Sequence, residues 1–158
     1  MWIDKNFPLT EQKEIERAIA EWNTALNQGL AMQVASVKFD MEWSEIERCL
    51  SENGIMILSV PSYGDVMRYV DDGNIGAKTD KIGGNVIYLL NDRVNKDNIF
   101  AFTLHEMGHV LGAEHTEHGL MYPRYRSNKT YCVDKEAVEQ VARYNGLDIN
   151  KLNYCKQE

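Results

Sequence analysis

Three histidines and one glutamate fall within residues 105–115, and their spacing favours metal-assisted hydrolysis. His105 and His109 are four residues apart, so on a helix their rings lie on one face and can present two nitrogens to one metal ion. Glu106 lies one step around the same helix, where its carboxylate can reach a water on the metal and act as a general base. Two ligands and a base in this arrangement predict a zinc-activated water at this helix.

A third histidine completes the ligand set if the helix ends before it. Gly112 accepts a left-handed conformation at little cost, so the chain can turn there and bring His115 back toward the metal. Three neutral imidazoles leave the fourth position of a zinc ion open, which is typical of a catalytic rather than a structural site. We therefore expect one catalytic Zn2+ ion bound by His105, His109 and His115, with Glu106 as the catalytic residue.

The same stretch resembles a known family. Residues 105–115 match H-E-x-x-H-x-x-G-x-x-H, the signature of the metzincin zinc metalloproteases. Residues 120–125 are similar to the methionine turn of the matrixin branch, the matrix-metalloproteinase-like catalytic domains. In that family the methionine, here Met121, lies beneath the zinc and its histidines. The resemblance also implies a metzincin-like zincin fold and a substrate pocket walled by Tyr122, Pro123 and Tyr125.

The activity that this resemblance implies is that of a zinc-dependent endopeptidase, a hydrolase that cleaves peptide bonds with a zinc-activated water. Its partner would be a peptide or protein substrate, extended along the edge of the sheet near residues 85–90. A pocket with the three walls named above would prefer an apolar residue after the scissile bond. Two alternatives stay open, namely a zinc-stabilised peptide-binding module without turnover and a metal-dependent amidase.

Helical periodicity and caps predict the elements that position these residues. The expected helices span residues 10–27, 44–51, 98–111 and 135–145. Thr10, Asp97 and Asp134 are the expected caps at the starts of three of these helices. Gly112 and Gly146 are the expected stops of the second long helix and of the helix that follows the methionine turn.

Apolar runs of strand length predict a small sheet. The expected strands span residues 33–39, 55–60 and 85–90. Residues 61–84, with several glycines, are expected to form a long loop. The pattern predicts an α+β fold in which a small twisted mixed sheet packs on two long helices, with a C-terminal helix after the methionine turn.

The length, net charge and hydropathy of the chain limit which partners and how many domains are expected. With 158 residues, the chain is expected to be a single metalloprotease catalytic domain over residues 1–158. A net charge of −7 disfavours binding to nucleic acid, and no apolar run is long enough to span a membrane. We therefore expect neither nucleic acid nor a membrane as a partner. We also expect a monomer. The N-terminal residues lack the pattern of a signal peptide, so the expected location is cytoplasmic unless the chain is a trimmed secreted domain.

The cysteines leave two interpretations open. Cys132 and Cys155 either form a disulfide across the last helix or remain buried thiols, and Cys49 stays free in both cases.

A second ion is also considered. Calcium could bind the aspartates of the glycine-rich loop, although a solvated acidic loop is the favoured interpretation of Asp65, Asp71, Asp72 and Asp80. His118 is expected to be a loop residue rather than a ligand, which leaves too few histidines for a second zinc site.

Overall fold

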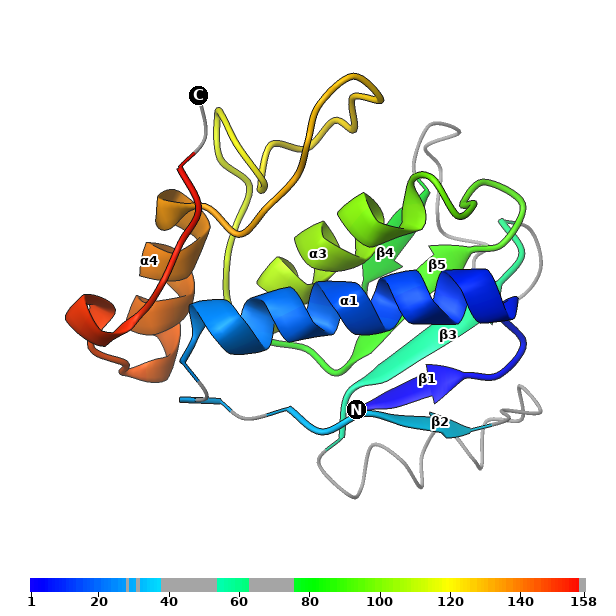
Figure 1. The fold of residues 1–158 in the computed structure, drawn as a ribbon, viewed down its shortest axis with the longest axis horizontal. Coiled ribbons are helices and arrows are strands. Elements are labelled where there is room, and N and C mark those ends of the chain that lie inside the picture. The colour runs from blue at the N-terminus through cyan, green and yellow to red at the C-terminus, as the bar shows by residue number, and fades with distance from the viewer. Residues whose placement is uncertain (28, 31, 38–53, 63–75, 157–158) are drawn as a thin grey trace.

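A five-stranded mixed sheet forms one layer of the molecule (Figure 1). The computed structural model describes residues 1–27, 29–30, 32–37, 54–62 and 76–156. The strands are β1 (Trp2–Asp4), β2 (Ala35–Val37), β3 (Met56–Val60), β4 (Ala77–Thr79) and β5 (Val86–Leu90). Their order is β2-β1-β3-β5-β4, with β4 antiparallel to β5 and the other neighbours parallel. The predicted α+β class with a mixed sheet is therefore confirmed.

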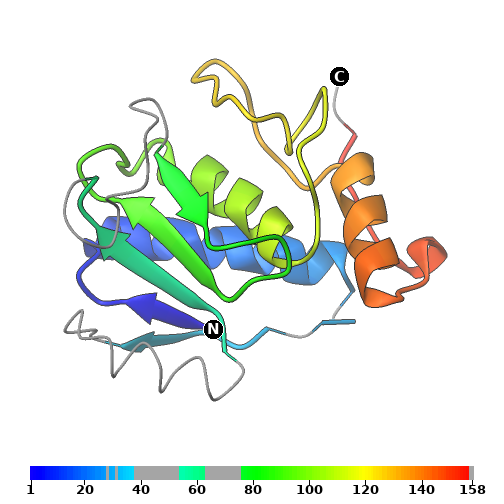
Figure 2. The ribbon, with the colours of Figure 1, turned by 180° about the vertical axis from the view of Figure 1, so that it is seen from behind.

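Two long helices cover one face of this sheet. Helix α1 (Leu9–Ala25) and helix α3 (Ile99–Val110) lie side by side on the same face, as the front and back views show (Figures 1 and 2). Helix α4 (Lys135–Asn145) lies beyond the ends of α1 and α3, away from the sheet, and a short 3-10 helix, η1 (Ile149–Lys151), follows it. The long segment between α3 and α4 therefore runs outside the two-layer body.

Helix α1 forms because one of its faces is apolar at helical spacing. Ile15, Ile19 and Trp22 lie on that face and are buried. The indole Nε1 of Trp22 also donates a hydrogen bond to the backbone carbonyl of Leu104 in α3, at 2.8 Å. The expected cap was wrong: the helix begins at Leu9, one residue before Thr10, without a side-chain cap.

The other two described α-helices begin differently. Helix α4 starts as predicted, with Asp134 accepting a hydrogen bond from the backbone of Ala137, and ends at Gly146, whose φ is 68°. Helix α3 follows Asn98 and has no side-chain cap, so the expected role of Asp97 was wrong. The side chain of Asn95 instead accepts hydrogen bonds from the backbone N–H groups of Asp97 and Asn98, which turns the chain into the helix.

The strands confirm part of the prediction and correct one point that bears on function. Strand β3 is buried along its whole length and pairs in parallel with β5, as its continuous apolar sequence indicates. Strands β1 and β4 were not predicted, and β4 lies within the expected loop 61–84. Because β5 lies between β3 and β4, residues 85–90 are not at the sheet edge as expected. Among the described strands, the edge on that side is β4.

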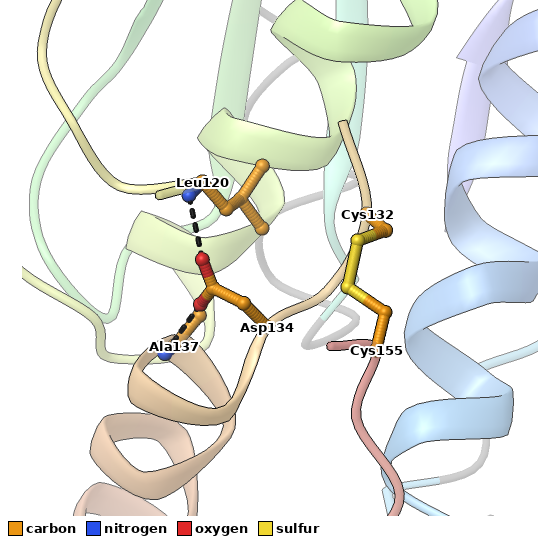
Figure 3. The surroundings of a disulfide bond; sticks show 5 residues. All are labelled: Leu120, Cys132, Asp134, Ala137 and Cys155. Atoms are coloured by element: carbon orange, nitrogen blue, oxygen red, sulfur yellow. Dashed lines mark hydrogen bonds between the residues drawn. A yellow bond between two sulfur atoms is a disulfide. The ribbon is translucent and has the colours of Figure 1, made fainter. Parts of the chain in front are cut away.

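The polypeptide after α4 is fastened to the segment before it. Cys132 and Cys155 form a disulfide, with their Cα atoms 6.2 Å apart, so the first of the two cysteine interpretations holds (Figure 3). In addition, Asn153 donates backbone and side-chain hydrogen bonds to carbonyls at the end of α1, those of Ala25 and Thr24. The tail thus connects α4 to the end of α1.

Several predictions concern residues outside the described part of the chain. These are the helix over 44–51, the free thiol of Cys49 and the loop aspartates Asp65, Asp71 and Asp72. Among the described helices, none has the length and apolar character that crossing a membrane requires.

Candidate metal centre

The last two turns of α3 and the loop after it bring three imidazole rings together. His105 and His109 project from the same face of α3, and His115 returns to them after the helix has ended. The Nε2 atom of His109 lies 3.1 Å from the Nε2 atom of His105 and 3.1 Å from that of His115. The three predicted ligands are therefore brought into one cluster, whereas His118 is exposed and lies outside it.

Gly112 makes this return possible. Its φ is 113°, a left-handed backbone conformation that residues with a side chain rarely adopt. An added Cβ atom at this position would also lie 2.2 Å from the Cγ atom and 2.5 Å from the Cβ atom of Tyr144 in α4. The turn thus needs glycine both for its backbone conformation and for the close approach of α4.

Hydrogen bonds to backbone carbonyls fix the tautomers of the two helical histidines. The Nδ1 atom of His105 is 2.7 Å from the carbonyl oxygen of Leu120, and the Nδ1 atom of His109 is 2.8 Å from that of Ala113. A carbonyl oxygen can only accept, so each Nδ1 atom carries the hydrogen. Each neutral ring therefore turns the lone pair of its Nε2 atom toward the centre of the cluster.

This donor set fits a zinc ion. Tetrahedral Zn–N bonds of about 2.0–2.1 Å place neighbouring nitrogens roughly 3.3 Å apart, close to the spacing found here. Burial lowers the pKa of the His105 imidazole to about 4, and burial followed by the charge of His109 lowers the pKa of His115. Neutral imidazole is the form that binds a metal. The facing Nε2 lone pairs of His105 and His109, with no hydrogen between them, are satisfied by a shared cation.

Glu106 is buried and is held by a residue from the edge strand. The hydroxyl of Thr79 in β4 donates a short hydrogen bond to the Oε2 atom of Glu106 and is 3.3 Å from the Glu106 carbonyl oxygen. Burial raises the pKa of the Glu106 carboxyl above its ordinary value, and the hydrogen bond from Thr79 opposes that rise. The side chain of Thr79 thus fixes one carboxylate oxygen of the predicted base.

Met121 packs directly against the helix that carries the histidines. An added Cβ atom at Gly108 would lie 2.5 Å from the Sδ atom of Met121, so the sulfur occupies the space that this glycine leaves beside His109. The loop that presents the methionine is closed by a hydrogen bond from the backbone of Thr116 to the carbonyl of Met121, at 3.0 Å. The buried sulfur therefore lies against the ligand-bearing turn of α3.

The three residues expected to wall a pocket lie in the segment that follows. Tyr125 packs on Phe102 of α3, with ring centroids 4.9 Å apart, and stacks on Tyr131 at 5.6 Å. Tyr122 is partly buried and has the guanidinium of Arg126 over its ring at 5.0 Å, while Pro123 is exposed. Of the three, Tyr125 lies against α3 through Phe102, about one turn before His105.

Two contacts made by residues 79 and 80 were not predicted from the sequence. Thr79 carries no motif and lies in a strand that the sequence did not indicate, so no signal could have linked it to Glu106. The described aspartate of the calcium candidates, Asp80, accepts hydrogen bonds from the backbone of Asn85 and Val86 and so closes the turn between β4 and β5.

Comparisons with known proteins point to one family. The family model described as matrixin matches residues 7–144. A curated relative, interstitial collagenase B of Mus musculus, is 27% identical over an alignment that covers 95% of this chain and 36% of the relative. The chain therefore spans about a third of the length of that relative.

A pair of glycine substitutions tests the turn that returns His115. Gly112 and Gly146 both have positive φ, but an added Cβ atom meets Tyr144 at Gly112 and nothing within 4 Å at Gly146. Gly146→Ala should lower the free energy of unfolding by about 1–2 kcal/mol, the cost of the backbone conformation alone. Gly112→Ala should cost about 1–3 kcal/mol more, because α4 must shift. Urea unfolding measures both, and equal losses would contradict this account.

Proposed function

This chain belongs to the matrixin family, and from that premise we propose that it is a zinc endopeptidase whose ion is held by His105, His109 and His115. The observation that carries the proposal is the convergence of three Nε2 atoms within 4.8 Å of one another beside the buried carboxylate of Glu106. A site built only to hold a metal has no need of a buried base next to its ligands. The fold and the family match support a metalloprotease in general.

The chemistry of the reaction is divided between the ion and the chain. When bound, zinc supplies a Lewis acid that makes a water acidic and polarises the scissile carbonyl. Glu106 accepts a proton from the attacking water as the water oxygen bonds to the carbonyl carbon. Glu106 then delivers that proton to the amide nitrogen as the carbon–nitrogen bond breaks, which leaves a carboxyl group and an amine.

Thr79 prepares Glu106 for this proton transfer. With Oε2 engaged by the Thr79 hydroxyl, we assign the water proton to Oε1. A base whose rotation is restricted in advance loses less freedom when the substrate binds. Thr79 is therefore a positioning residue for Glu106.

The substrate is assigned to the outer edge of β4 rather than to residues 85–90. Hydrogen bonds from Leu90 to Gly76 and from Asp80 to Val86 direct the backbone groups of residues 76 and 80 toward β5. By the alternation of an antiparallel pair, those of Ala77 and Thr79 face outward. An extended peptide can pair with these outward groups, close to the Glu106 that Thr79 contacts.

The preference for an apolar residue after the scissile bond rests on the aromatic segment. Tyr125 is 38% exposed although it packs on Phe102 and Tyr131, so part of its ring is available to a substrate. Tyr122 and Pro123 precede it in the same segment. An apolar side chain buried against these rings would gain free energy by leaving water.

The disulfide bears on where the protein works. Disulfides persist in oxidising compartments and are rare in the reducing cytosol. The Cys132–Cys155 bridge therefore favours an oxidising compartment as the place where this domain folds and acts.

Replacing the base separates metal binding from catalysis. Glu106→Gln should retain zinc, because the three ligands are unchanged, while cleavage of a fluorogenic peptide falls about 100- to 10,000-fold. The exposed Glu117→Gln serves as the matched control and should leave both quantities unchanged. Undiminished cleavage by Glu106→Gln would refute the assignment. Peptide binding without turnover by the zinc-loaded wild type would favour the binding module instead.

Two substitutions at Thr79 test the hydrogen bond to the base. Thr79→Val removes the hydroxyl at nearly constant shape and should lower kcat about tenfold with little change in KM, because it removes a hydrogen bond to a charged group. Thr79→Ser retains the hydroxyl and should keep kcat near that of the wild type. If serine and valine reduce kcat equally, strand packing rather than the hydroxyl explains the effect.

A peptide library tests the pocket. The wild type should cleave before apolar residues, and Tyr125→Ala should weaken that preference because one apolar wall is removed. Tyr154→Ala, which truncates a tyrosine of the C-terminal tail that is 43% exposed, is the control and should leave the profile unchanged. Sequencing of the cleaved products gives the profile, and an unchanged profile for Tyr125→Ala would remove this residue from the pocket.

A further inference from the structure

The carboxylate of Asp134 serves two segments of the chain at once. Its Oδ1 atom accepts a hydrogen bond from the backbone N–H of Ala137 at 3.0 Å and thereby caps α4 (Figure 3). Its Oδ2 atom accepts a second hydrogen bond, from the backbone N–H of Leu120 at 2.7 Å. Capping needs only the first of these bonds. The second fixes the backbone of the segment that precedes Met121.

Because Leu120 also contacts the predicted metal ligand His105, the constraint on its backbone affects that ligand. Its N–H is held by Asp134, and its carbonyl oxygen is the partner of the His105 Nδ1 atom at 2.7 Å. The Leu120 side chain is fully buried, which leaves the residue little freedom to adjust. A shift of the Leu120 backbone would therefore turn the His105 ring or break its Nδ1 hydrogen bond. Partners of this kind set both the tautomer and the direction of a ligand histidine.

The C-terminal tail fixes Asp134 in turn. Cys132, two residues before Asp134, forms the disulfide with Cys155. The backbone N–H of Cys155 donates to the carbonyl of Val133 at 2.8 Å, and Asp134 and Cys155 form a parallel β-bridge. The tail therefore holds the approach to α4 by one covalent bond and by backbone pairing. Asp134 itself is only 8% exposed.

We propose that Asp134 is a positioning residue of the metal centre, acting through Leu120 on His105, and that the Cys132–Cys155 disulfide holds it in place. Zinc affinity then depends on a carboxylate and a disulfide that do not touch the ion. The inference rests on the proposed zinc site, but it concerns metal affinity and is separable from peptide cleavage.

Asp134→Ser tests the carboxylate. A serine hydroxyl still caps α4 by accepting from Ala137, but it does not span both Ala137 and Leu120. The apparent zinc affinity, measured by competition with a chromophoric chelator, should fall about 10- to 100-fold. The visible absorption spectrum of the cobalt-substituted protein should also change, because the His105 ring is reoriented.

A core substitution in the same helix is the matched control. Val141→Ala loosens the packing of α4 without removing a partner of Leu120, since Val141 is fully buried and distant in sequence from the cap. It should lower the melting temperature and leave zinc affinity and the cobalt spectrum unchanged. If Asp134→Ser does not fold, Asp134→Asn takes its place, because the amide keeps a single acceptor. Wild-type zinc affinity and cobalt spectrum in the folded Asp134 variant would overturn the proposal.

The disulfide is tested without a thiol reductant, which would itself bind zinc. The double variant Cys132→Ser and Cys155→Ser should lower zinc affinity in the same direction as Asp134→Ser. Adding Asp134→Ser to it should cost less than the sum of the separate losses, because both act through one position. Unchanged affinity in the double cysteine variant, or fully additive losses, would refute the role of the disulfide. Absence of peptide cleavage by the zinc-loaded wild type would instead overturn the endopeptidase function and leave these affinity comparisons intact.

Discussion

Three imidazole lone pairs directed at one point repel one another unless a cation lies between them. The folded chain imposes this arrangement on His105, His109 and His115, and much of the surrounding structure can be understood as the means of doing so. The carbonyls of Leu120 and Ala113 hold the Nδ1 atoms of His105 and His109, so these two rings cannot rotate away from one another. Lone pairs held in this arrangement are favourable only with a cation between them, which is why the cluster fits the zinc ion that we propose.

Contacts with neighbouring elements hold α3, the helix that carries two of these rings, in a fixed position. Helix α3 is fastened to α1 by the hydrogen bond from Trp22 to the carbonyl of Leu104, the residue before His105. Met121 fills the space beside Gly108, and Thr79 holds Glu106 from the edge strand. Because two ligands and the base come from one helix and His115 follows directly after its Gly112 turn, small errors in the positions of distant elements are not multiplied at the site.

How much of the structure could be predicted from the sequence depends on how far apart along the chain the interacting residues lie. The metal ligands and α4 were predicted because spacing along a helix, an aspartate cap and a glycine stop are local signals. Strands β1 and β4 have three residues each and exist through pairing with partners far along the chain, which no local pattern reveals. Thr79 was missed for the same reason. The second hydrogen bond of Asp134 was missed because its capping role already explained the residue.

The disulfide also gives the domain an order of assembly. During synthesis the ligand helix and the cap of α4 leave the ribosome before Cys155, so the chain carries all three histidines for a time without the bond that holds Asp134. If Asp134 acts on His105 as we propose, the metal centre reaches its final form only after Cys132 and Cys155 have been oxidised. For the zinc endopeptidase that we propose, tight binding of the metal therefore follows the oxidation of this cysteine pair.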